Sequence, residues 1–232
     1  MTSTLTVEDL TFEVRWSNRR KTVELSVERD GSLVILAPSG TADSLLEGYV
    51  RDKTFWIYTK LAQKEALQHP VTAKEYVTGE GFHYLGKTYR LLLVDKQDTP
   101  LKLEEGQFKL LRVEAEQGRN HFICWYTAHA QPWIRRRVER FAPRVGAAPT
   151  GVEVRELGFR WGSCGKAGGL NFNWATILLP PSVVEYVIVH ELVHLLEPNH
   201  TPEFWTRVER TMPDFEKRKA WLAEHGAGYV QL

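Results

Sequence analysis

Three histidines and a glutamate near the C-terminal end of the chain have the residue types and spacing of a catalytic metal site. His190 and His194 lie four residues apart, with Glu191 directly after the first, which is the pattern HExxH. On a helix, residues four apart project from one face with their Cβ atoms about 5–6 Å apart, which suits two ligands of one tetrahedral zinc ion. His200 follows six residues later and can supply a third nitrogen. Three histidine ligands leave the fourth position of the metal open, as a catalytic zinc requires.

Glu191 is the candidate catalytic carboxylate. It points about 100° away from His190 around the helix, so it is poorly placed as a third ligand but can reach a water bound to the metal. A buried carboxylate costs on the order of several kcal/mol unless it lies near a cation, and a metal with its water provides such a partner. Because HExxH also occurs by chance, the interpretation depends on the helix and the third histidine around it.

The element that must carry this pattern is a helix with signals at both ends. Pro180 and Pro181 precede it, Ser182 and Glu185 have the spacing of a capping box, and Pro198 is expected to mark its end. Its valines, leucines and isoleucine spread around most of the circumference, which predicts a buried helix. The two histidines therefore have an apolar setting.

The segments on either side of this helix are expected to complete the site. Residues 201–203, Thr-Pro-Glu, have the order of a helix start, and the helix that follows would help to fix where His200 points. Upstream, strands over 152–161 and 170–174 are expected to form a hairpin around a glycine-rich turn, with an open edge for an extended peptide. Cys164 lies in this turn without a sequence-adjacent base, so we favour neither a nucleophile nor a ligand role for it.

The rest of the chain alternates strand and helix signals. We predict strands over 12–16, 22–28, 32–37, 82–85, 88–94, 101–104 and 107–113, one helix from about 45 to 69, and a second from 119 to 145. Pro132 falls inside the second helix and predicts a kink or a break. We place the functional boundary near residue 117. This gives a strand-rich region, 1–116, with one long helix, and a second domain, 117–232, that carries the metal-binding pattern.

Composition restricts the possible partners and compartment. The chain has 232 residues, 25% of them charged, and a net charge of +1. Its overall charge therefore gives no electrostatic attraction to nucleic acid or to a membrane surface. Five arginines between residues 135 and 144 of the predicted second helix are expected to form a solvated face, with nucleic-acid contact as the alternative. Two distant cysteines give no disulfide framework, and we see neither a signal peptide nor an apolar run of membrane-spanning length. These features predict a cytoplasmic protein.

A set of motifs runs from about residue 153 to 226. It comprises Arg160-Trp161-Gly162-Ser163-Cys164, Leu170-Asn171-Phe172-Asn173-Trp174, Pro180-Pro181, the HExxH helix, Asn199-His200, Phe204-Trp205, Pro213-Asp214 and Lys219-Ala220-Trp221-Leu222. Together they resemble the YgjP-like metal-dependent hydrolases, a family related to the SprT-like and minimal gluzincin-type zinc peptidases. The hairpin around residues 19–21 resembles the family more loosely. Ala175 departs from the pattern, which commonly has an arginine after the Asn-Trp pair.

The resemblance implies a fold, a cofactor and a set of roles. It implies that His190, His194 and His200 bind zinc and that Glu191 is the general base. It also implies an α+β fold in which the strand-rich N-terminal part is followed by a zincin-like helical core, with a hairpin before the metal-binding helix.

Three functions follow as hypotheses. The first is a zinc metallopeptidase acting on a peptide or protein, in which Glu191 accepts a proton from a zinc-activated water and Arg160 and Trp161 are candidate substrate-binding residues. The second is a UTP pyrophosphatase, a label that family members also carry, with Arg160, Lys166 and Arg155 near the phosphates. The third is a nucleic-acid- or protein-binding module with structural zinc, against which the intact glutamate and the open fourth position argue.

Overall fold

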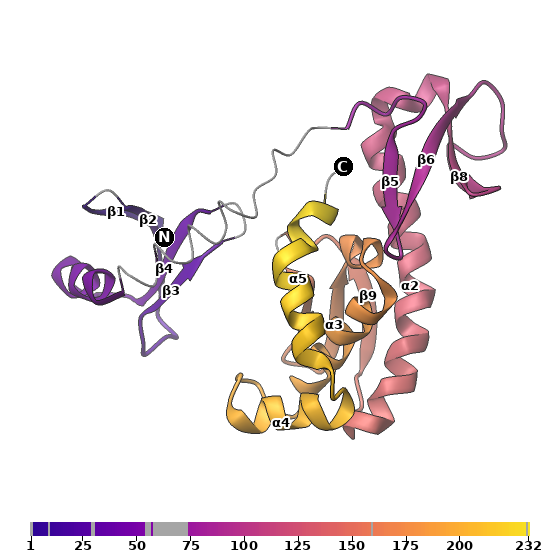
Figure 1. Ribbon diagram of the computed structural model, residues 1–232. Coiled ribbons are helices and arrows are strands. Elements are labelled where there is room, and N and C mark those ends of the chain that lie inside the picture. Colours follow the sequence, from indigo (N-terminus) through magenta and orange to yellow (C-terminus); the bar gives the residue numbers. More distant parts are fainter. Residues whose placement is uncertain are drawn as a thin grey trace. The chain divides into compact units, whose positions relative to one another are not determined.

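The computed structural model describes residues 2–8, 10–28, 31–53, 57, 74–158, 160–230 and 232. The chain divides into two compact units, Met1–Pro70 and Val71–Leu232, which we call the N-terminal and C-terminal units (Figure 1). The functional boundary placed at residue 117 does not coincide with this division, since residues 82–110 share one hydrophobic core with the helices that follow. That boundary stays a prediction about function.

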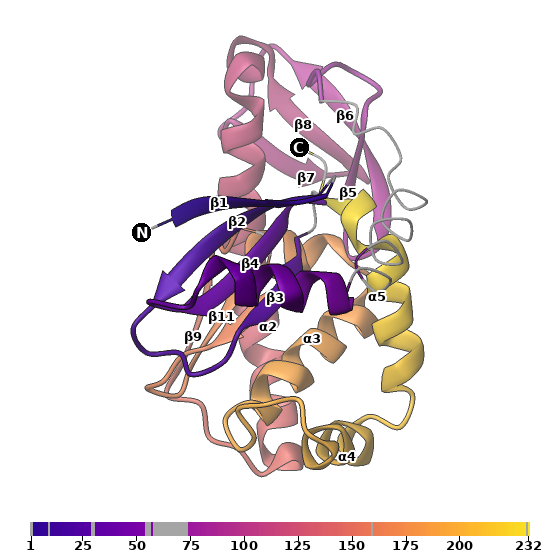
Figure 2. The ribbon, with the colours of Figure 1, turned by 90° about the vertical axis from the view of Figure 1, so that its left-hand side faces the viewer.

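The N-terminal unit is a four-stranded sheet in the order β1-β2-β4-β3. Its strands are β1 (Thr2–Val7), β2 (Leu10–Ser17), β3 (Glu24–Val27) and β4 (Leu33–Pro38), and β2 and β4 are parallel. Three of them confirm sequence predictions. β1 was not predicted, and it is an edge strand held by antiparallel pairing with β2. A helix over residues 43–53 covers one face of the sheet (Figure 2) and contributes Leu46 and Val50 to the core. The rest of the predicted helix up to 69 lies outside the described residues, apart from 57.

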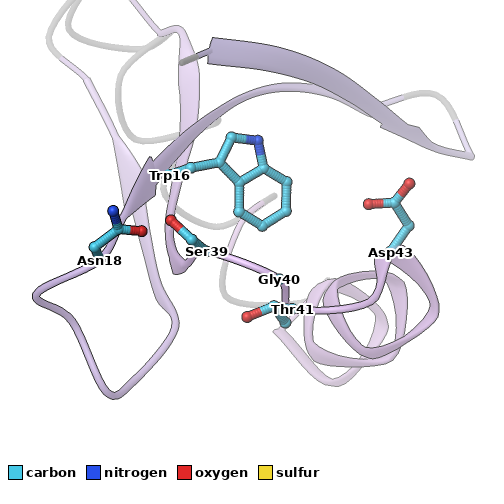
Figure 3. A pocket seen from close by; sticks show the side chains of 6 residues that line it. All are labelled: Trp16, Asn18, Ser39, Gly40, Thr41 and Asp43. Carbon is cyan, nitrogen blue, oxygen red and sulfur yellow. The ribbon is translucent and has the colours of Figure 1, made fainter.

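A pocket of about 570 Å³ lies in this unit where β2 and β4 end (Figure 3). It is lined by Trp16, Asn18, Ser39, Gly40, Thr41 and Asp43. The Trp16 indole N–H donates a hydrogen bond of 3.0 Å to the Ser3 hydroxyl, which fixes the aromatic wall of the pocket. The described residues of this lining include one carboxylate and neither histidine nor cysteine, so they do not form a metal site.

The C-terminal unit contains two sheets. The first has the strands β5 (Gly81–Tyr84), β6 (Lys87–Val94), β7 (Leu101–Glu104) and β8 (Gln107–Leu111), in the order β5-β6-β8-β7. The second has β9 (Gly151–Arg155), β10 (Gly162–Cys164) and β11 (Gly169–Asn173), in the order β10-β11-β9. The four strands of the first sheet confirm the predictions from sequence.

Helices form the rest of the C-terminal unit. They are η1 (Arg112–Gln117), α2 (Gly118–Val145), η2 (Trp174–Leu178), α3 (Pro181–Val193), α4 (Pro202–Thr211) and α5 (Phe215–Tyr229). Helix α3 packs between α2 and α5 (Figure 1), and nine of its residues are buried, as its apolar circumference predicts. Helix α2 continues through Pro132 without a break. In the part of the chain that the structure describes, no helix has both the length and the apolarity to cross a membrane. The α+β fold class is confirmed.

The predicted capping box at the start of α3 is wrong. The helix begins at Pro181 with Pro180 as its N-cap residue, and no side chain caps it. Proline suits a first turn because its missing N–H would have no helical partner there. The Glu185 carboxylate instead accepts a hydrogen bond of 3.1 Å from Arg140 of α2. The helix also ends earlier than Pro198, at Val193, with His194 as the C-cap residue.

The predicted hairpin has different strands. β9 ends at Arg155 and runs parallel to β11, whereas the antiparallel hairpin before α3 is formed by β10 and β11. The chain turns between β9 and β10 because the Glu156 carboxylate accepts hydrogen bonds from the Gly158 N–H (3.0 Å) and the Trp174 indole (2.7 Å). The hairpin thus precedes the helix as expected, but β10 is its outer strand.

Candidate metal centre

The structure brings the three predicted histidines together. The Nε2 atom of His190 lies 3.2 Å from that of His194 and 3.0 Å from that of His200. Two nitrogens bound at about 2.0–2.1 Å to one tetrahedral ion would be about 3.3 Å apart, so the spacing is that of ligands around a common centre. Within the described residues, this trio is the group of histidine, cysteine and carboxylate side chains with metal-ligand geometry.

The protonation of these rings also fits a metal. The Nδ1 atom of His194 lies 3.1 Å from the Glu197 carbonyl oxygen, so Nδ1 carries the proton and Nε2 presents its lone pair. Burial, together with His194 and His200, lowers the pKa of His190 to about 3, and burial also lowers the pKa of His200. Neutral imidazoles whose lone pairs converge need a shared cation or proton, and a divalent metal ion fits the donor set.

The aromatic ring of Phe204 forms a floor under the three imidazoles. Its centroid lies 4.9, 4.6 and 4.8 Å from the ring centroids of His190, His194 and His200. Phe204 is fully buried near the start of α4, where its N–H donates to the Thr201 hydroxyl at 3.4 Å. The predicted helix start after His200 is confirmed, but the sequence indicated only an apolar stripe here, and the packing against all three rings was not predicted.

Glu191 faces β10 from the buried side of α3. Its side chain is 6% exposed, and a Cβ atom added at Gly162 would lie 2.7 Å from Glu191 Cγ and 2.9 Å from its Oε1. Gly162 is therefore required for this close approach of strand and carboxylate. Burial raises the pKa of Glu191 to about 7, partly offset by the positive charge of Arg160.

A cleft of about 640 Å³ opens onto the histidines and Glu191. It is lined by Arg160, Gly162, Ser163, Cys164, Gly165, Lys166, Gly168, His190, Glu191, His194, Leu195, Pro198 and His200. The lining includes Arg160, a predicted substrate-binding residue. It does not include Trp161, which is half-buried beside α5, where a Cβ added at Gly226 would lie 3.1 Å from its Cζ2. A role of either residue in substrate binding stays a prediction.

Two other reactive side chains lie near the carboxylate. Burial and the negative charge of Glu191 raise the pKa of the Cys164 thiol, which favours the protonated form and opposes a nucleophilic role. Burial and Glu191 raise the pKa of Tyr186 to about 12, and Tyr186 does not line the cleft. Among the described residues of the cleft lining, Glu191 thus stays the candidate base.

The raised pKa of Glu191 predicts a pH-dependent stability of the metal-free protein. The native state binds the Glu191 proton more tightly than the unfolded state, so this group's contribution to stability is full below pH 4.5 and is lost as pH rises through about 7. A shift of this size corresponds to about 3 kcal/mol. With metal removed by chelation, the free energy of unfolding of wild type minus that of Glu191→Gln should therefore fall by about 3 kcal/mol between pH 4 and pH 8. Denaturant melts at both pH values measure it, and a difference that does not change with pH would contradict it.

Comparison with known proteins gives a family match. The family model described as YgjP-like, metallopeptidase domain, matches residues 21–225, which takes in the N-terminal unit from residue 21 onward as well as the histidines. No curated protein matches. A solved structure, the metallopeptidase zymogen of Pyrococcus abyssi abylysin, matches with 22% identity, covering 38% of this chain and 89% of its own, at a TM-score of 0.35.

Proposed function

Because the chain belongs to the YgjP-like family of metallopeptidase domains, we propose that it is a zinc-dependent peptidase in which His190, His194 and His200 hold the ion and Glu191 is the general base. The observation that carries the proposal is the convergence of three Nε2 atoms, 3.0 and 3.2 Å apart, beside a buried carboxylate in one cleft. Three imidazoles suit zinc and leave its fourth position for solvent or substrate.

The roles of the residues follow from their environments. A zinc ion in this site would act as a Lewis acid and lower the pKa of a bound water toward about 7. Glu191 is the carboxylate beside the histidines in the cleft, so it is placed to accept a proton from water and to pass it to the leaving amine. His194 is oriented through its contact with the Glu197 carbonyl, and Phe204 excludes water from the floor of the site.

The edge of the second sheet supports a peptide substrate. β10 pairs with β11 on one side and has no strand on its other side among the described residues. It also carries Gly162, which approaches the Glu191 side chain. An extended peptide that adds to β10 as a further strand would bring its carbonyl groups past the carboxylate.

Nucleotide hydrolysis is the second candidate. It is favoured by Arg160 and Lys166 in the cleft lining, because phosphates need cations. Arg155, also named for this role, lies on β9 and does not line the cleft. A binding module with structural zinc receives less support, since three protein ligands do not close a tetrahedral site.

Metal content and substrate choice test the proposal together. The purified protein should retain close to one zinc ion per chain, and the zinc-loaded form should hydrolyse members of a mixed peptide library and leave UTP intact. Treatment with a chelator should abolish hydrolysis, and zinc should restore it. Cleavage of UTP without cleavage of any peptide would reject the peptidase in favour of the second candidate.

A further inference from the structure

The cleft beside Glu191 has two positively charged residues, one at each end of β10. Arg160 lies two residues before β10 begins, and Lys166 lies two residues after it ends. Both are exposed and both line the cleft. An extended peptide paired along this three-residue strand would therefore pass both charges.

The charge of the cleft differs from that of the whole chain. The chain has a net charge of +1, with nearly equal numbers of acidic and basic residues. Among its described residues the cleft lining, by contrast, has Arg160 and Lys166 against a single carboxylate, Glu191. A divalent ion on three neutral histidines would add two further positive charges. The cleft thus has a positive electrostatic potential. Its protein walls have a low dielectric constant, which strengthens the attraction of this potential for an anionic ligand.

Among the described residues neither Arg160 nor Lys166 is held in a direct ion pair, although the positive charge of Arg160 acts on Glu191 from a longer distance. Arg207, on the helix after His200, does form one, with Glu197 at 3.3 Å. Arg207 is thus used for internal pairing, whereas the two cations of the cleft have no direct ion pair among the described residues and can meet a ligand.

We propose that the cleft selects peptides that carry a carboxylate close to the scissile bond, with Arg160 and Lys166 as the residues that determine this specificity. The inference rests on the proposed peptidase function, because it names the substrate class of the same site. A carboxylate of Asp or Glu beside the scissile bond would pair with one of the two cations once the peptide lies along β10. The phosphates of a nucleotide are also negatively charged, so the experiment must distinguish an acidic peptide from a nucleotide as the ligand.

The experiment compares peptides that differ in one residue. Quenched fluorescent peptides with Glu, Gln or Lys at each position flanking the scissile bond are hydrolysed by zinc-loaded full-length protein. We expect kcat/KM for the best Glu peptide to exceed that of its Gln counterpart by about three- to tenfold at low salt, and the ratio to shrink as salt rises. The ratio should fall toward one in the double variant Arg160→Gln, Lys166→Gln. The variant Arg155→Gln is the matched control, because Arg155 is exposed outside the cleft, and it should keep the wild-type ratio.

Binding separates a failure of this inference from a failure of the proposed function. Fluorescence anisotropy of the same labelled peptides on zinc-loaded Glu191→Gln measures charge selection without hydrolysis, and UTP serves as competitor. Tighter binding of Glu than of Gln peptides, lost when Arg160→Gln and Lys166→Gln are both added, supports the inference even where no peptide is cleaved. Equal binding of Glu and Gln peptides, or an equal loss in the Arg155→Gln variant, overturns it. UTP binding without peptide binding overturns it as well.

Discussion

Replacing Glu191 with glutamine is expected to lower kcat for peptide hydrolysis by about 10²- to 10⁴-fold, while the metal content stays unchanged. Glutamine keeps the size and most of the packing of the buried side chain, but it cannot accept a proton. The ion would be held by three histidines and not by Glu191, so the substitution should not change the metal content. Steady-state hydrolysis of the best library peptide, with metal analysis of the same sample, measures both quantities.

The control for this substitution must separate proton transfer from folding. Glu197 is suitable, because its carboxylate pairs with Arg207 at 3.3 Å and only its carbonyl oxygen contacts His194. Glu197→Gln should therefore retain hydrolysis within a few-fold of wild type, since the carbonyl is unchanged. A Glu191→Gln enzyme with the normal rate would show that Glu191 is not the base, and one that has lost its metal would contradict the expectation that the three histidines hold the ion without it.

The parts of the site that the sequence predicted are those set by local geometry. His190 and His194 share a helix face through a spacing of four residues, and the start of α4 was recognised from Thr201 and Pro202. The position of His200 near the other two histidines could also be predicted, because only six residues separate it from His194. These features depend on covalent distance and on helix geometry, which a single sequence contains.

The parts that were missed depend on contacts between distant segments. Phe204 contacts three histidines from a different helix, and Gly162 approaches Glu191 across 29 positions of sequence. The parallel pairing of β9 with β11 could not be predicted either, because hydrophobic alternation indicates a strand but not the strand it pairs with. The capping box failed since two prolines can themselves begin a helix. Tertiary packing decided each of these cases.

Substituting Gly162 with alanine is expected to lower kcat by about 10²-fold without removing the metal. The added methyl group would lie 2.7 Å from Glu191 Cγ and 2.9 Å from Oε1, closer than side-chain atoms can approach. Either β10 or the carboxylate must therefore move, and a displacement of about 1 Å of a catalytic group costs about that factor in rate. The three atoms nearest the added methyl group all belong to Glu191 and none to the histidines, so metal affinity should be retained.

The matched control for this substitution is Gly169→Ala, at the start of the partner strand β11. A Cβ added there would meet only the Thr150 hydroxyl oxygen, at an ordinary contact distance of 3.8 Å, so its hydrolysis should stay within a few-fold of wild type. Both substitutions remove a glycine from the same hairpin, and only one displaces the carboxylate. Because Glu191→Gln has already lost the base, adding Gly162→Ala to it should lower the rate little further. Fully additive losses in the double variant would mean that Gly162 acts on the reaction by another route than Glu191.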